Sequence, residues 1–446
     1  MTKLKNETET EKVTGTVDEM DVIGRGLVIV DGRSFAHAGV FPGDRVELEP
    51  GERGDKFWQV VRICKPSPDR LKSDCPFHGA CGGCDLIELS EKARIRFKEQ
   101  VVRKAIESFS EEATCRILPF ISAPQVIRYR HRMRLHQGRR AGKTDAGFLP
   151  SKLAEADETS DSGIVPITAC ALLMKPLAKR LVAARRALAA LPIKVRCLHL
   201  ACSVEGDEKV AGHVVLPPGT SARRGKPLLE NLMKAADLSG ISMGPDDGSV
   251  EGVIGSVILT GAVAPGVDGG PYSFEPAIFT QGNVAQNRRL IEAVMKLGMV
   301  EPGERVVEGF AGAGNFTLAF AAAGVCVEAF ESSPGAVRMG NKNLHRGKFT
   351  ELASIVEGDA HTLMFRAAPH PALLLVDPPR SGMHDIGNLA KKLQPRRVVL
   401  VSCDAESLTR DGKRLAAAGY KAIEGVGIDL YPRTHHVEAV VAFAKA

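Results

Sequence analysis

Two residues near the end of the chain could carry covalent chemistry on an unreactive carbon. Cys403 follows the apolar run VVLVS, so the sequence predicts it at the carboxyl end of a buried strand. Most cysteines on strands are core residues, and position alone favours that ordinary interpretation. Glu438 shifts the balance, because it stands at the start of the apolar strand EAVVAFA, where a carboxylate is expected only if it faces a cleft. A thiol that adds to a substrate and a carboxylate that accepts a proton are therefore the leading catalytic candidates.

A glycine-rich turn earlier in the chain is typical of a nucleotide-like ligand. In the run VVEGFAGAGNFTL, Gly312 and Gly314 stand between an apolar strand and a helix, where glycines let a ligand approach the backbone. A dinucleotide fingerprint would carry a third glycine at Thr317, so the pattern argues against a pyrophosphate. Glu331 ends the next strand, VCVEAFE, where it could accept hydrogen bonds from a ribose diol. The pattern indicates an adenosyl cofactor; the alternative is a tight turn with a surface acid.

Two further acids follow neighbouring predicted strands. Asp377 ends the run LLLVD, and the two prolines after it fix a loop that could form a wall for a flat base. Asp359 could meet an adenine edge, although an aspartate in a loop is as often a helix cap. Together with Cys403 and Glu438, this site suits methyl transfer to carbon 5 of a pyrimidine. In that reaction a thiolate adds at carbon 6, the resulting enolate attacks a sulfonium methyl, and a carboxylate removes the carbon 5 proton.

Three cysteines in the stretch CPFHGACGGC form a second candidate site. Cys75, Cys81 and Cys84 have the spacing C-x5-C-x2-C, and the glycines between them let the backbone bend around an ion. Three thiols this close together are difficult to explain by core packing, so the pattern indicates a metal. The spacing leaves zinc and an iron–sulfur cluster open, and it does not identify a fourth ligand.

Arginines alternate along the predicted strand RYRHRMRLH. Strict alternation would place Arg128, Arg130, Arg132 and Arg134 on one strongly positive face. Such a face could bind the phosphates of a nucleic acid. A solvated outer face of a sheet is an equally good interpretation.

The elements that position these residues change character along the chain. Residues 1–12 are charged and predicted to be disordered. Residues 13–64 alternate apolar and polar positions between glycine turns and predict a small β-barrel, with Asp31-Gly32 as a hairpin turn. The first part of the chain is therefore predicted to be a separate β domain.

The remainder of the chain divides into two parts. Residues 65–270 contain the cysteine-rich stretch and predict an α+β domain, in which the amphipathic helix 88–109 could pack on the following domain. Residues 271–446 alternate apolar strands with helices and predict a doubly wound, mostly parallel sheet. The predicted fold class is α/β, a Rossmann-like domain preceded by a barrel and an α+β domain.

Length, charge and composition limit the classes of protein to which this chain could belong. The chain has 446 residues, enough for two to four domains at roughly 150 residues each. Its net charge of +6 permits a polyanionic partner without requiring one. No run approaches the roughly 18 apolar residues of a membrane span, and the amino terminus has no apolar signal region. Ten cysteines without an export signal favour reduced thiols, so we expect a cytoplasmic protein.

In their order and separation, these motifs resemble those of the RNA uracil-C5 methyltransferase family, in particular its ribosomal RNA members. The resemblance covers nearly the whole chain. IGRGLVIVDGRSFAHAGVFPGDRVELE resembles the TRAM domain, an RNA-binding barrel, and PAIFTQGN resembles the glutamine-bearing cofactor motif. SCDAESLTRD and YPRTHHVE resemble the nucleophile and base motifs. The chain has Glu308 and Ala311 where members usually have Asp and Cys, and Asp404-Ala405 where they usually have Asn-Pro.

The resemblance implies methylation of carbon 5 of a uridine in ribosomal RNA of the 23S type, with S-adenosylmethionine as cofactor. Cys403 would be the nucleophile and Glu438 the proton acceptor. It also implies a [4Fe–4S] cluster on Cys75, Cys81, Cys84 and Cys170, with a structural or RNA-bracing role, because methyl transfer from a sulfonium needs no electron. The implied cofactor contacts, besides Gly312 and Gly314, are Gln281, Phe310, Asn315, Glu331, Asp359 and Asp377.

RNA, most of all ribosomal RNA, is the expected partner, with no membrane and no second subunit. Two alternatives stay open. A transfer RNA uridine-C5 methyltransferase is the nearer one, and the barrel and the cysteine stretch count against it. A non-catalytic iron–sulfur RNA-binding protein on the same scaffold is the other, and the presence of both Cys403 and Glu438 counts against it.

Overall fold

The computed structural model describes residues 12–51, 54–110, 115–140, 142–151, 163–218, 226–261 and 272–445. The predicted tail, residues 1–12, lies outside them except for Lys12. The chain forms two compact units, one of residues 1–78, 83–98 and 433–435 and the other of residues 79–82, 99–432 and 436–446. None of the helices in the described ranges has the length and apolarity that crossing a bilayer requires.

Five antiparallel strands of the first unit form one sheet. They are β1 (Val13–Met20), β2 (Gly26–Val30), β3 (Arg33–His37), β4 (Arg45–Gly51) and β5 (Gly54–Lys65). The strand order is β3-β2-β1-β4-β5, and β3 also contacts β5, so the sheet curls back on itself as a small barrel does. The predicted hairpin turn is confirmed, since Asp31 and Gly32 have φ of 50° and 75° between paired Val30 and Arg33.

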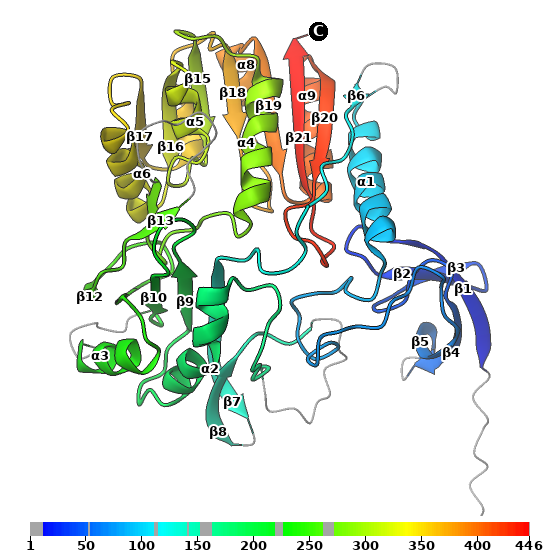
Figure 1. Cartoon of the computed structure of the whole chain (residues 1–446). Coiled ribbons are helices and arrows are strands. Elements are labelled where there is room, and N and C mark those ends of the chain that lie inside the picture. The colour runs from blue at the N-terminus through cyan, green and yellow to red at the C-terminus, as the bar shows by residue number, and fades with distance from the viewer. Residues whose placement is uncertain are drawn as a thin grey trace, which may run out of the picture. The chain divides into compact units, whose positions relative to one another are not determined.

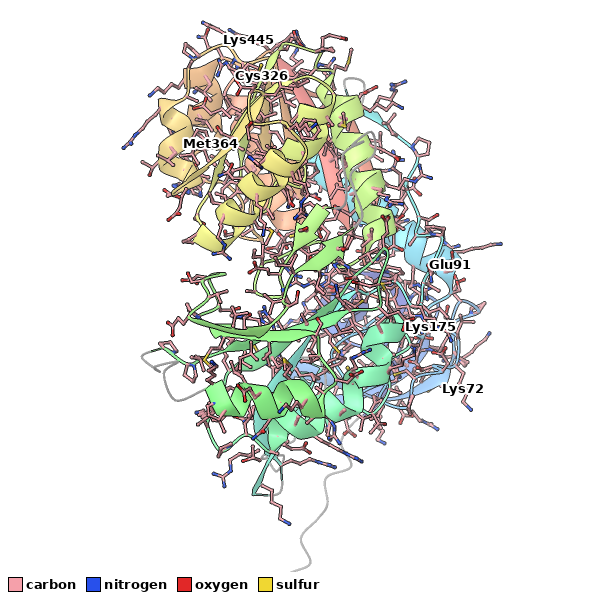
Figure 2. The ribbon with its side chains drawn as sticks, turned by 60° about the vertical axis from the view of Figure 1, so that its left-hand side comes forward. Lys72, Glu91, Lys175, Cys326, Met364 and Lys445 are labelled. Atoms are coloured by element: carbon pink, nitrogen blue, oxygen red, sulfur yellow. The ribbon has the colours of Figure 1, made fainter. Side chains whose placement is uncertain are left out.

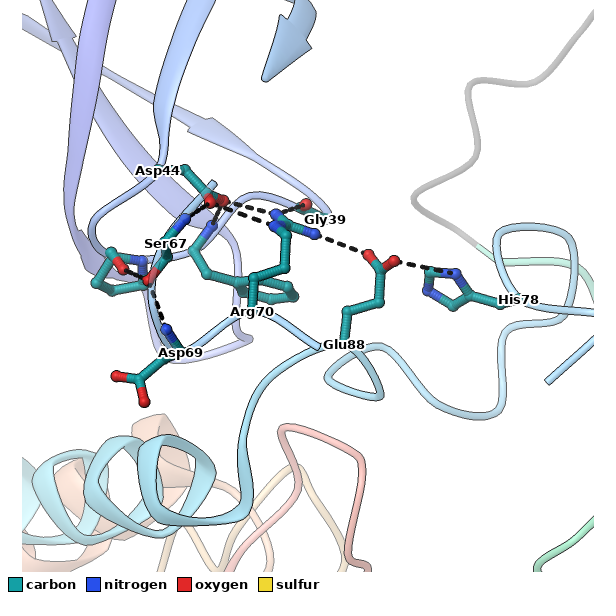
Figure 3. Close-up of polar contacts among 9 residues, drawn as sticks. Gly39, Asp44, Ser67, Asp69, Arg70, His78 and Glu88 are labelled. Atoms are coloured by element: carbon teal, nitrogen blue, oxygen red, sulfur yellow. Dashed lines mark hydrogen bonds and ion pairs between the residues drawn. The ribbon is translucent and has the colours of Figure 1, made fainter. Parts of the chain in front are cut away.

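A buried carboxylate joins this sheet to the segment that follows it. Asp44 has no exposed surface, and it accepts hydrogen bonds of 2.7 Å from the backbone amides of Phe41 and Ser67. Arg70 donates to both Asp44 oxygens, over 2.6 Å from Nη2 and 3.2 Å from Nε, and its Nη1 donates to Glu88 over 2.8 Å (Figure 3). The carboxylate therefore fixes the chain on both sides of β5.

Replacing Asp44 with alanine is expected to lower the free energy of unfolding of this sheet by about 3 to 5 kcal/mol, because Arg70, 13% exposed, loses its buried counter-ion. Trp58 is the single tryptophan of the chain and lies in the core of the sheet, so its fluorescence during urea unfolding measures the change. Arg62→Ala is the control: it removes an exposed ion pair with Glu47 and should cost less than about 1 kcal/mol. Equal unfolding midpoints for wild type and Asp44→Ala would contradict this assignment.

The second unit contains a six-stranded sheet with helices packed against it. Its strands are β7 (Arg132–Arg140), β8 (Lys143–Gly147), β9 (Cys197–Cys202), β10 (Val210–Val215), β11 (Gly240–Gly244) and β12 (Gly252–Gly255). The order is β12-β11-β10-β9-β7-β8, and all neighbours are antiparallel except the pair β10 and β11. Helices α2 (Lys175–Ala189) and α3 (Lys226–Ala235) contact this sheet, and a small hairpin of β13 (Leu259–Gly261) and β14 (Tyr272–Phe274) follows it.

An eight-stranded sheet forms the rest of the second unit. Its strands are β6 (Arg116–Ile117), β15 (Arg305–Gly309), β16 (Cys326–Glu331), β17 (Ala353–Glu357), β18 (Leu373–Val376), β19 (Arg397–Ser402), β20 (Tyr420–Ile428) and β21 (Glu438–Lys445). The order is β17-β16-β15-β18-β19-β21-β20-β6, with β21 antiparallel to both neighbours and the other pairs parallel. Strand order reverses between β15 and β18, which is where ligands bind in doubly wound sheets.

Helices cover both faces of this sheet. They are α4 (Val284–Gly298), α5 (Thr317–Ala322), α6 (Pro334–Arg346), α7 (Ala360–Leu363), the short 3-10 helix Met364–Arg366, α8 (Ile386–Leu393) and α9 (Ala405–Ala417). Figure 1 shows α4 and α5 on one face and α9 on the other. The predicted helix 88–109 is α1 (Glu91–Glu107), and its last turn packs against β20, where Ile106 meets Gly425. The described residues thus include the predicted doubly wound fold.

The two ends of the sheet differ in what they carry. Cys326, where β16 begins, and Lys445, where antiparallel β21 ends, lie together at one end (Figure 2). The carboxyl ends of β15, β18 and β19 are at the opposite end, together with the start of β21. The predicted reactive residues Asp377 and Cys403 follow the carboxyl ends of β18 and β19, and Glu438 begins β21. All three therefore lie at this end of the sheet.

Candidate active site

A sharp turn leads from the end of β15 into α5. Phe310 and Gly312 have φ of 63° and 56°, in the left-handed region. A Cβ at Gly309 would lie 2.4 Å from the sulfur of Met364, so the strand end has no room for a side chain. The backbone amide of Gly312 donates to the carboxylate of Glu331 over 2.8 Å. The glycine turn and the strand-end acid, predicted separately, are therefore in direct contact.

A hollow with about 1110 Å³ of free space, partly open to solvent, lies beside this turn. Its wall includes backbone from the turn, side chains from the segment before α4, and the residue that follows β18. Among the predicted cofactor contacts, those that line the hollow are Gln281, Phe310, Gly312, Asn315 and Asp377.

The other predicted cofactor residues lie outside this wall. Glu331 accepts a hydrogen bond from the backbone amide of Gly312, which does line the hollow. Gly314 has φ of 87° and packs toward Leu318. Asp359 caps the start of α7, and the hydroxyl of Thr362, which donates to it over 2.8 Å, is the main reason that its pKa is lowered. Asp359 thus has the helix-cap role that the sequence left as the alternative.

Cys403 and Glu438 lie side by side on antiparallel strands. Ser402, the last residue of β19, pairs with Ala439, so Cys403 follows directly opposite Glu438 at the start of β21. Glu438 is 4% exposed, and within the described ranges its Oε2 has no hydrogen-bond partner. A buried carboxylate without a partner is unfavourable for folding, so its presence indicates a functional group.

The ionisable groups at this edge raise one another's pKa. Burial, followed by the charges of Glu438 and Asp377, raises the pKa of the Cys403 thiol to about 12. Burial and Asp377 raise the pKa of Glu438, and burial raises the pKa of Asp377 to about 7. The charge of Asp377 therefore acts on both Cys403 and Glu438. A cation bound among them would favour their ionised forms.

Arg380 is a cation whose charge acts on both Cys403 and Glu438. Its charge lowers the pKa of both Cys403 and Glu438. Nη2 of Arg380 lies 3.1 Å from Nε2 of His436, and because a guanidinium only donates, the imidazole accepts this bond. The sequence prediction missed Arg380, although its place directly after Asp377 and two prolines was a usable signal.

A group of possible metal ligands flanks the turn but does not converge on an ion. Nδ1 of His361 lies 2.8 Å from Oδ1 of Asp385, and the His361 and His384 rings stack with centroids 4.9 Å apart and planes 27° apart. Nearly parallel imidazoles direct their lone pairs alongside each other and not toward a common point. The cluster is therefore a hydrogen-bonded stack beside Phe310, whose ring meets His361 edge-on.

Known proteins resemble this chain along almost its whole length. No protein-family model matches it. The 23S rRNA (uracil(1939)-C(5))-methyltransferases RlmD of Dechloromonas aromatica and Shewanella amazonensis are each 29% identical to it, over 441 and 442 residues. These alignments cover 96% and 97% of this chain and 99% and 96% of those proteins. Over nearly its whole length the chain is therefore similar to RNA uracil-C5 methyltransferases.

A solved structure resembles this chain over the same extent. It is the Pyrococcus abyssi tRNA (uracil-54, C5)-methyltransferase in complex with S-adenosyl-L-homocysteine, with a TM-score of 0.68 and 20% identity. The match covers 97% of this chain and 100% of that chain. At this level of identity the likeness shows a shared fold.

The departures from the usual motifs of the methyltransferase family have local explanations. Glu308 is 1% exposed, and it accepts a 2.7 Å hydrogen bond from the hydroxyl of Thr317. Burial raises the pKa of Glu308 to about 8, so its carboxyl is mostly neutral at pH 7. Asp404 caps α9 by accepting from the amide of Ser407 over 2.8 Å. Asparagine caps helices equally well, so this departure preserves the start of α9.

The predicted arginine face has a different geometry in this methyltransferase. The expectation that all four arginines share one strand is wrong, because β7 begins at Arg132 and Arg128 has φ of 54°. Arg132 points inward and donates to the carbonyls of Ile278 and Thr280, over 2.9 Å and 3.3 Å. Burial lowers its pKa to about 10. Arg132 therefore supports the segment that leads to Gln281, while Arg128 and Arg134 are exposed and Arg130 is partly buried.

The four predicted cluster ligands of the methyltransferase lie in loops. Cys75 and Cys84 belong to the first unit, Cys81 and Cys170 to the second, and all four are partly buried. In the described part of the chain, none of them forms a disulfide. Next to Cys81, a Cβ at Gly82 would lie 2.6 Å from the carbonyl oxygen of Pro150, so this glycine is required.

Proposed function

We propose that this chain methylates carbon 5 of a uridine in ribosomal RNA of the 23S type, with S-adenosylmethionine as methyl donor. The observation that carries the proposal is the adjacency of Cys403 and Glu438, with Asp377 next to both and on the wall of the hollow. The curated relatives, which match nearly the whole chain, carry 23S rRNA uracil methyltransferase names, and this supports ribosomal RNA over transfer RNA.

The residues around the hollow suit S-adenosylmethionine, which supplies a methyl group on a positively charged sulfur. Asp377 lies on the wall of the hollow, where its carboxylate would favour a cation. Glu331, held at the glycine turn, is proposed to bind ribose hydroxyls. The remaining proposed contacts are Gln281, Phe310, Gly312, Gly314, Asn315 and Asp377, with Asp359 reaching the site only if it leaves its helix cap.

Cys403 and Glu438 are proposed to divide the reaction between them. The Cys403 thiolate, favoured by the charge of Arg380, forms a bond to carbon 6 of uracil, and the double-bond electrons move toward the carbonyl at carbon 4. Carbon 5 would then form a bond to the methyl group, and the bond between that methyl group and the sulfonium sulfur would break, with its electron pair left on the neutral sulfur. Glu438 accepts the carbon 5 proton, the C–H electron pair restores the ring double bond, and the bond between sulfur and carbon 6 breaks. Cys403 is returned as a thiolate.

We propose the following roles for the other parts. Residues 13–64 form a TRAM-like RNA-binding barrel, residues 65–270 a central domain and residues 271–446 the catalytic domain. Arg128, Arg130 and Arg134 are proposed to contact RNA phosphates, whereas the donors of Arg132 are engaged within the protein. The protein is proposed to act as a monomer in the cytoplasm.

A [4Fe–4S] cluster is proposed on Cys75, Cys81, Cys84 and Cys170. Support comes from the close spacing of three of them and their partial burial. The cluster would be structural, since the transfer involves no change of oxidation state.

Cys81→Ser is expected to remove the brown colour and most of the iron and sulfide from anaerobically purified protein, because serine is a poor ligand for iron in such clusters. Visible absorbance and iron analysis measure the change. Cys326→Ser is the matched control, since Cys326 begins β16 at the other end of the sheet and should leave the colour unchanged. A colourless wild type that contains only zinc would contradict the cluster assignment.

Methyl transfer itself is tested with radiolabelled S-adenosylmethionine and RNA from a strain that lacks the gene. Ribosomal RNA should become labelled, and digestion should release 5-methyluridine. Label in transfer RNA alone would favour the transfer RNA alternative, and absence of label from every RNA fraction would favour a non-catalytic binding protein.

A further inference from the structure

Tyr431 makes a contact that the proposed reaction does not yet use. It lies in the loop between β20 and β21, and its phenol hydroxyl donates to Oε1 of Gln281 over 3.2 Å. Gln281 lines the hollow. We propose that Tyr431 is a positioning residue, which holds the Gln281 amide so that its NH2 group faces the ligand. The inference rests on the proposed function, and it concerns the orientation of the Gln281 side chain toward the ligand.

Other bonds already hold the two loops together. Asn283 Nδ2 donates to the carbonyl of Leu430 over 3.1 Å, and Gln286 Nε2 donates to the carbonyl of Asp429 over 3.0 Å. Gly282 lies against the Tyr431 ring, since a Cβ there would be 3.5 Å from Cε1. The two loops would therefore remain in contact, with the same separation, if the phenol hydroxyl were removed. What this hydroxyl adds is control over the rotation of the Gln281 side chain.

The chemistry of an amide gives that rotation a consequence. A glutamine side chain has an acceptor at one end and two N–H donors at the other. Because Oε1 of Gln281 accepts from Tyr431, the NH2 group is the end left for a ligand. Burial and the charge of Glu438 raise the pKa of Tyr431, so the phenol keeps its proton and stays a donor near neutral pH. The matching ligand atom is an acceptor oxygen, either a uracil carbonyl or the carboxylate of the cofactor.

The test is Tyr431→Phe, which keeps the ring and removes only the hydroxyl. We expect the Michaelis constant for either S-adenosylmethionine or RNA to rise about threefold to tenfold, because the loss of one ordinary hydrogen bond has an effect of this size. The melting temperature should change little. Calorimetry with S-adenosylmethionine alone separates the two sources of the acceptor. Weaker cofactor binding identifies the carboxylate, whereas unchanged cofactor binding with a higher Michaelis constant for RNA identifies the uracil carbonyl.

Two comparisons distinguish positioning from a general structural role. Tyr420→Phe is the matched control, because the hydroxyl of Tyr420 donates to the carbonyl of Pro395 over 3.0 Å in the core; it should lower stability and leave both Michaelis constants unchanged. If Tyr431 acts through Gln281, adding Tyr431→Phe to Gln281→Ala should produce no further loss.

Full additivity of the two substitutions, or a Tyr431→Phe variant identical to an active wild type, would overturn the inference alone. A wild type that methylates no RNA would overturn the proposed function and this inference with it.

Discussion

Cys403→Ala is expected to abolish methyl transfer, with a loss of about four or more orders of magnitude in rate, because carbon 5 of uracil is too weak a nucleophile without addition at carbon 6. RNA containing 5-fluorouridine gives the clearest measurement. Fluorine replaces the proton that Glu438 would remove, so the wild type with S-adenosylmethionine should form a covalent RNA–protein complex that survives denaturing electrophoresis. Cys403→Ala should form none.

The same thiol can be followed without RNA. With a pKa near 12, Cys403 is almost entirely protonated at pH 7, so its alkylation should accelerate about tenfold per pH unit between roughly pH 7 and 10. Mass spectrometry of the peptide that contains Cys403 measures the rate. Cys326→Ala is the control for both experiments, and it should give the wild-type adduct. An adduct in Cys403→Ala would refute this cysteine as the nucleophile.

Glu438→Gln is expected to stop the reaction after the methyl group has moved. Glutamine has nearly the same shape and cannot accept the carbon 5 proton, so restoration of the ring double bond and release of the sulfur should fail. With ordinary uridine RNA and S-adenosylmethionine, this variant should accumulate a covalent complex that carries one methyl group, while multiple turnover falls by about three or more orders of magnitude.

The double variant Cys403→Ala with Glu438→Gln is the control, because it should form no complex. Normal turnover by Glu438→Gln would show that another group removes the proton. A variant that binds S-adenosylmethionine and RNA but forms neither product nor complex would place Glu438 before the methyl transfer, which contradicts the proposed division of roles.

Much of the fold could be predicted because its signals are local. Alternating apolar runs predict buried strands, glycine positions predict the turn after β15, and the Asp31-Gly32 pair predicts a hairpin. Cys403 and Glu438 were recognisable because each is a reactive residue at the end of an apolar run. Periodicity and turn chemistry are properties of a few neighbouring residues, so the sequence displays them directly.

The interpretation of several residues changed once the structure showed which distant residues lie next to them. Arg132 belongs to a regular alternation of arginines, yet it donates to carbonyls more than 140 positions along the chain. Asp359 had two interpretations, and the hydroxyl of Thr362 accounts for the cap. The place of Arg380 after Asp377 and two prolines marks a loop at the end of a strand, and only the structure shows that its charge acts on Cys403. Each role depends on which distant segment lies opposite, and a one-dimensional pattern does not contain that information.

The sequence by itself determined the order of the strands along the chain, the residues that end them and the reactive groups available at those ends. Tertiary structure decided which ends meet: the antiparallel insertion of β21 beside β19 places Glu438 opposite Cys403, and β6 joins the far edge of the same sheet, where Arg116 pairs with Glu424, 308 positions later in the chain. The physical reason is that local conformation follows from nearby residues, whereas strand pairing follows from the burial and hydrogen bonding of the whole fold.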